Sequence, residues 1–76
     1  MMAAGKRQAI HIFSVFIDFS DQRTTMPYMG LSEPRAAQAF YRAVLAAQAD
    51  PLAYQVTMRR DARLWTQVQV KTGVPA

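Results

Sequence analysis

The clearest pattern in the chain is an alternation of apolar and polar residues within Leu52–Lys71. Every second residue from Leu52 to Met58 is apolar, and the same period returns between Leu64 and Val70, with Thr66 as a polar exception. A period of two is typical of strands that bury one face. A charged segment, Arg59–Arg63, separates the two runs. The pattern therefore predicts a β-hairpin.

The length of the turn decides which residues of this hairpin face each other. All residues of both apolar sets have even sequence numbers. If the two sets are buried on the same face, the sequence numbers of any two residues that face each other must therefore add up to an even number. A two-residue turn at Asp61-Ala62 gives an odd sum, whereas a three-residue turn over 60–62 gives an even one. Such turns favour glycine at the last position, where this chain has Ala62. The predicted register pairs Met58 with Leu64, Val56 with Thr66, Tyr54 with Val68 and Leu52 with Val70.

The opposite face of this hairpin combines basic, polar and aromatic side chains. The same register places Arg59 opposite Arg63, and like charges directly across a hairpin are mildly destabilising. One interpretation is that this face binds an anionic or polar partner. The alternative is a solvated outer face, with Trp65 partly covered by its neighbours. The candidate partner-binding residues are Trp65, Arg59, Arg63, Gln55, Gln67 and Lys71.

Residues 9–19 are predicted to form a long strand that is apolar on both sides. Alternate residues from Phe13 to Phe19 make one strong apolar face, and His11 falls on that same side. The other side carries Ile10, Ile12 and Phe16. One helix cannot cover both faces of a sheet, so we expect these three residues to contact a second copy of the chain or an obligate partner.

The middle of the chain predicts an edge strand followed by one helix. Thr24–Met29 can return as a short strand, which Pro27 confines to an edge because proline cannot donate to a ladder. Ser32 is a suitable N-cap, and an apolar stripe indicates a helix over 33–48. The predicted fold is α+β: a three- or four-stranded antiparallel sheet of order β-(β)-α-β-β, with one helix on one face.

Composition sets broad limits on this fold and its partners. Seventy-six residues predict a single domain over 1–76, with 1–8 and 73–76 fraying at its ends. No cysteine is present to form a disulfide or a thiolate metal site, which fits a reducing cytoplasm. The apolar run of residues 9–19 is too short to span a bilayer, so no membrane role is expected. A net charge of +4 permits binding to nucleic acid or to an acidic protein surface.

The residue types used in catalysis and metal binding occur singly. His11 is the one histidine, and no motif places a nucleophile beside it, so a structural role is favoured over that of a general base. The five carboxylates have no metal-ligand spacing, and the glycines form no phosphate-binding loop. We therefore expect no catalytic residue, no metal and no cofactor.

The order hairpin, helix, hairpin, with Asp50-Pro51 before the last hairpin and the sequence RRDARLW at its turn, resembles small orphan proteins of bacterial phages and mobile elements. Some of those proteins are compact sheet-plus-helix inhibitors of host defence, including anti-CRISPR proteins. The likeness covers residues 10–71, and this chain has Ala62 where glycine is more usual. The resemblance implies a non-enzymatic binding role in the cytoplasm of a bacterial host, without naming a target.

Two functions follow as hypotheses. The first is a small non-catalytic protein that binds a macromolecule through the helix-free sheet face, most concretely an inhibitor of a host machine. The alternative is a nucleic-acid-binding module that uses Trp65 and the flanking arginines for stacking and phosphate contact.

Overall fold

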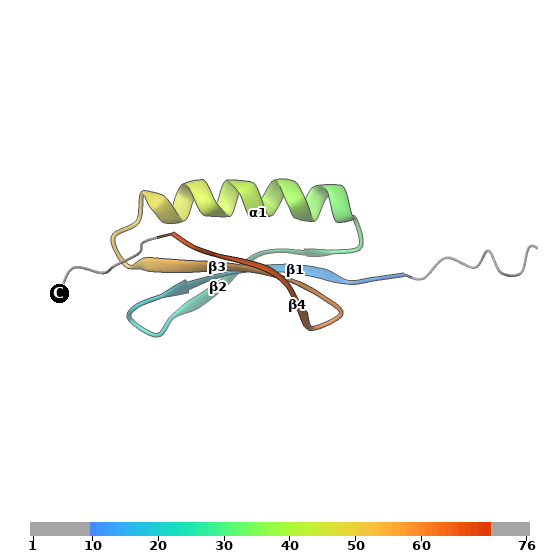
Figure 1. Cartoon of the computed structure of the whole chain (residues 1–76), viewed down its shortest axis with the longest axis horizontal. Helices are drawn as coiled ribbons and strands as arrows, with labels where there is room; N and C mark the ends of the chain where they lie inside the picture. The colour runs from blue at the N-terminus through green and yellow to red at the C-terminus, as the bar shows by residue number, and fades with distance from the viewer. Residues whose placement is uncertain (1–9, 71–76) are drawn as a thin grey trace, which may run out of the picture.

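Residues 10–70 of the computed structural model form an open antiparallel sheet with one helix packed on one face (Figure 1). In chain order the elements are β1 (Phe13–Phe19), β2 (Thr24–Gly30), α1 (Glu33–Gln48), β3 (Ala53–Arg60) and β4 (Arg63–Gln69). The four strands lie in the order β2-β1-β3-β4. The predicted α+β fold is confirmed, with segment 24–30 as a strand. The predictions for residues 1–8, Lys71 and residues 73–76 lie outside the described residues.

The core lies between α1 and the two central strands. The alternate residues of β1 from Phe13 to Phe19 are all buried, as their period of two predicted. Val15 and Val56 have no solvent exposure, and burying a side chain of this kind stabilises a fold by roughly 2 kcal/mol. Alanines on the inner side of α1 let the helix approach the sheet closely. The buried apolar set is Phe13, Val15, Ile17, Phe19, Ala36, Ala43, Ala47, Ala53, Val56 and Met58.

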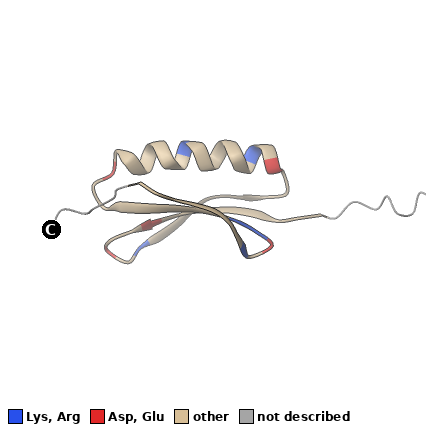
Figure 2. Cartoon of the chain, viewed as in Figure 1, with Lys and Arg blue, Asp and Glu red and all other residues tan. Residues whose placement is uncertain are grey.

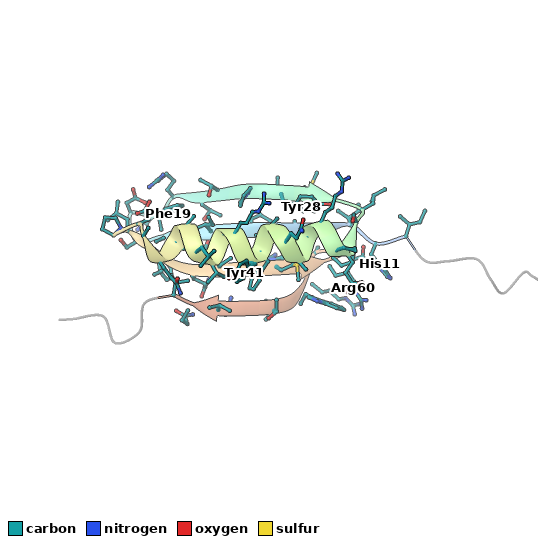
Figure 3. All side chains as sticks on the ribbon, turned by 90° about the horizontal axis from the view of Figure 1, so that it is seen from above. His11, Phe19, Tyr28, Tyr41 and Arg60 are labelled. Atoms are coloured by element: carbon teal, nitrogen blue, oxygen red, sulfur yellow. The ribbon has the colours of Figure 1, made fainter. Side chains whose placement is uncertain are left out.

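Helix α1 begins and ends where the sequence predicts. The hydroxyl oxygen of Ser32 accepts a hydrogen bond from the backbone N–H of Arg35 at 3.2 Å, which satisfies a donor that the first turn leaves free. After the helix, the Asp50 carboxylate accepts from the Leu52 N–H at 2.8 Å and turns the chain toward β3. Seen from above, α1 lies over β1 and β3, and β4 lies beside it (Figure 3).

Strand β2 is an edge strand, as Pro27 predicted. Its pairing with β1 shifts between Val15 and Ile17, where β2 has one residue more than β1. Met26 and Pro27 lie at this bulge, one of the few places in a sheet that accept a residue without an N–H. The edge is therefore irregular at its middle.

The turn between β3 and β4 differs from the prediction. Asp61 and Ala62 form a two-residue turn, and both have positive φ, at 53° and 68°. Two successive left-handed residues define the type I′ turn of tight hairpins. The predicted three-residue turn is therefore wrong, and Ala62 adopts a left-handed conformation that glycine usually provides in hairpin turns. The argument from even sums failed because β4 contains a bulge at Trp65. This one extra residue shifts the register, so a two-residue turn is compatible with even-numbered pairs farther along the strands.

Bulges also change which side chains of the hairpin are buried. Met58 pairs with Thr66 and Val56 with Val68, whereas Leu64 faces Arg59 and is exposed. A second bulge, in the pairing of β1 with β3, buries Ala53. It leaves Leu52 and Tyr54, which the alternation predicted to be inside, substantially exposed.

Candidate functional site

The helix-free face of the sheet carries a ladder of hydrogen-bonded polar side chains that crosses all four strands. The Thr24 hydroxyl and the Gln55 amide both donate to the Asp18 carboxylate, at 2.9 and 2.7 Å. Gln69 then donates to the Gln55 carbonyl oxygen at 2.8 Å. Because each of these groups has a partner on a neighbouring strand, the side chains are fixed relative to one another.

A charged corner lies on the same face, toward the turn of the second hairpin. The Arg59 guanidinium lies 5.5 Å from the ring centroid of Phe16, which is half-buried. A cation at this distance over an aromatic face is weakly attracted to it. Beside this pair, Gln67 donates to the buried Thr57 hydroxyl at 3.2 Å. A shallow depression of about 280 Å³ joins the corner to the ladder; it is lined by Phe16, Asp18, Thr24, Gln55, Thr57, Arg59 and Gln67.

Three of the candidate partner-binding residues come together on this face, namely Arg59, Gln55 and Gln67. The predicted pairing of Arg59 with Arg63 is wrong, because Arg59 faces Leu64. Gln55 faces Gln69, and Gln67 faces Thr57. Sequence reasoning missed Asp18, whose even number placed it on this face but whose role as the centre of a ladder needs the strand order. Lys71 lies outside the described residues.

Trp65 is not on the helix-free face, and this is the largest correction to the predicted site. Its ring meets the buried Phe13 ring edge-on, with centroids 6.4 Å apart, and the Arg60 guanidinium lies 4.0 Å above it. Phe13 belongs to the helix side of the sheet, so Trp65 packs on that side. Arg63 faces Arg60 across the hairpin and belongs to the same row. The physical reason is the bulge, which turns Trp65 toward the other side.

The turn of the second hairpin is attached to the chain that precedes β1. The Asp61 backbone N–H donates to the Ile12 carbonyl oxygen at 2.8 Å, and the Ile12 N–H donates to Asp61 Oδ1 at 3.0 Å. His11 Nδ1 lies 2.6 Å from Asp61 Oδ2. The Ile12 N–H first, then His11, and finally the charge of Arg60 hold the pKa of Asp61 below its ordinary value. No sequence motif signalled this contact, which joins residues about fifty positions apart.

The strand-one residues expected at a dimer or partner contact are only partly grouped. Ile10 is 76% and Ile12 49% exposed, and both precede β1, whereas Phe16 lies in the centre of the sheet beneath Arg59. The contact with a second copy or an obligate partner stays a prediction.

Within 10–70, no three side chains of the His, Cys, Asp or Glu type gather at a distance that could hold a metal ion. In that same range, no helix is long and apolar enough to cross a membrane. His11 contacts Asp61 and packs against the Phe13 ring.

No protein-family model matches the chain, and comparisons with curated proteins and with solved structures also find no match. The resemblance to phage and mobile-element proteins therefore rests on the residue pattern alone.

Proposed function

We propose that this chain is a small non-catalytic protein that binds another protein through the helix-free face of its sheet. The observation that carries the proposal is the ladder of Thr24, Asp18, Gln55 and Gln69, together with the corner formed by Phe16 and Arg59. A surface whose side chains are already held in place loses less conformational entropy on binding than a surface of free side chains.

The composition of this face indicates the chemistry of its partner. Arg59 supplies an exposed cation at one end, and the amide and hydroxyl groups supply donors and acceptors along the ladder. An acidic or amide-rich protein surface offers the matching groups, with a carboxylate placed over Arg59. The most concrete version is the inhibitor of a host machine implied by the resemblance to phage proteins.

Charge reversal at the corner tests this proposal. Arg59→Glu and Arg42→Glu change the net charge by the same amount, but Arg42 lies on α1, on the other side of the sheet. Wild-type protein and both variants are immobilised, and bound proteins from a bacterial lysate are compared after nuclease treatment. We expect a protein retained by wild type and Arg42→Glu to be lost from Arg59→Glu. Equal retention by all three, with unchanged melting temperatures, would refute the helix-free face as the binding surface.

A further inference from the structure

A second cationic surface lies on the other side of the sheet, at the turn of the β3–β4 hairpin. Basic residues gather at this turn, with Asp61 between them (Figure 2). His11 and Arg60 lie together there (Figure 3). A cavity of about 640 Å³ opens between them; it is lined by His11, Arg60, Asp61, Arg63, Leu64 and Trp65. This volume is within the usual range of small-ligand sites.

The position of the Arg60 side chain is determined by its stacking. Its guanidinium lies 4.0 Å from the centroid of the Trp65 ring, and the ring of the buried Phe13 packs perpendicular to Trp65. A guanidinium stacked on an indole is held in one plane, and its N–H donors point outward from the rim of that plane. Arg60 is thus oriented as a planar donor group at the wall of the cavity.

The charges around the cavity are not balanced within the described part of the chain. Arg60 and Arg63 face each other across the hairpin, an arrangement of like charges that weakens strand pairing. Among residues 10–70, the contacts within 4.0 Å between a carboxylate and a basic side chain are those of Asp61 with His11 and of Asp21 with Arg23, so neither arginine at the cavity has a carboxylate at that distance. Asp61 accepts from the Ile12 N–H with one oxygen and contacts His11 with the other.

We propose that this cavity binds a phosphate group, held between the guanidinium groups of Arg60 and Arg63. A phosphate placed there would accept charge-assisted hydrogen bonds from both arginines and relieve their repulsion. Trp65 serves as the support for Arg60, because the guanidinium lies over its ring and the Phe13 ring packs against it. The site is separate from the helix-free face, so either proposal can fail without the other.

The single tryptophan of the chain reports directly on this site. Trp65 fluorescence is followed while inorganic phosphate replaces chloride at constant ionic strength, and then with a mononucleotide and a short DNA duplex as ligands. The test variant is Arg63→Gln, which removes one phosphate ligand without disturbing the Arg60 stack. The matched control is Arg42→Gln, an exposed arginine on the helix.

We expect a saturable change in emission for wild type and Arg42→Gln, and affinity weaker by about tenfold in Arg63→Gln. Binding of phosphate or the mononucleotide alone would assign the site to a free phosphate ligand, whereas tighter binding of the duplex would assign it to a nucleic-acid backbone. For the duplex, Arg63→Gln should also reduce the slope of log affinity against log salt concentration by about one, which corresponds to the loss of one phosphate contact. No saturable change with any ligand, or the same affinity in Arg63→Gln, would overturn the proposal.

Discussion

Ala62 occupies a backbone conformation that alanine adopts only at a cost, so its replacement by glycine should stabilise the protein. Its φ of 68° lies in the left-handed region, as does the φ of 53° at Asp61. A residue with a Cβ atom is destabilised by roughly 1–2 kcal/mol in this region, whereas glycine has no such steric cost. Glycine also has more conformational entropy than alanine in the unfolded chain, and losing it on folding cancels roughly 0.5–1 kcal/mol of this stabilisation. The net stabilisation expected for Ala62→Gly is about 0.5–1 kcal/mol, since these two effects oppose each other.

Thermal unfolding measures this difference directly. For a domain of this size, 1 kcal/mol shifts the melting temperature by roughly 4–8 °C, so the expected rise for Ala62→Gly is about 2–8 °C. Ala37→Gly is the matched control, because Ala37 is exposed and lies within α1, where the same change should destabilise by about 1 kcal/mol. Ala62→Asn should also stabilise, since asparagine tolerates the left-handed region without glycine's freedom in the unfolded chain. If Ala62→Gly lowered the melting temperature while Ala37→Gly behaved as expected, the reasoning about the turn would be refuted.

Three further predictions concern packing, acid stability and assembly. Trp65→Ala should lower the free energy of unfolding by about 1–2 kcal/mol in a urea titration, because Trp65, although 42% exposed, packs against the ring of the buried Phe13. An unchanged midpoint would show that this contact does not stabilise the fold. The pKa of Asp61 is lowered from 3.8 by folding, so its contribution to stability is present above that value and is lost as the pH falls through the folded pKa. Asp61→Asn should therefore flatten the acid limb of a stability–pH curve, and an identical limb would contradict this. If Ile10, Ile12 and Phe16 meet a second copy, light scattering at micromolar concentration should give twice the monomer mass, whereas a monomeric mass would exclude the homodimer.

Alternation predicted the strands and failed at the bulges. The apolar face of β1 is regular, and its period of two gave the correct buried set from Phe13 to Phe19. The period of two holds only as far as the next bulge in a strand. Beyond the bulge, each residue lies on the face opposite to the one that the uninterrupted alternation would give it. Tyr54 and Trp65 are the extra residues in their strands. Tyr54 was expected to be buried but is exposed, and Trp65 was assigned to the helix-free face but packs against Phe13.

The helix was easier to predict because its signals are local. The Ser32 cap, the proline in the first turn and the stop near Asp50-Pro51 act within a few residues of the helix ends. The candidate site combines long-range contacts instead. The ladder through Asp18 and the contact of His11 with Asp61 depend on strand order and on a positive φ at the turn, neither of which the residue pattern contains.

The two edges of the sheet differ in their ability to pair with a further strand, and only the β4 edge is suited to it. At the β2 edge, Pro27 offers no N–H, and the bulge breaks the spacing that an incoming strand would need. The β4 edge is regular from Thr66 to Gln69, and this stretch contains neither proline nor a charged residue to repel a new strand. An extended segment from another chain would therefore add next to β4, and a lysine or proline placed within Thr66–Gln69 would close the last edge at which unfolded or misfolded copies could pair with this fold.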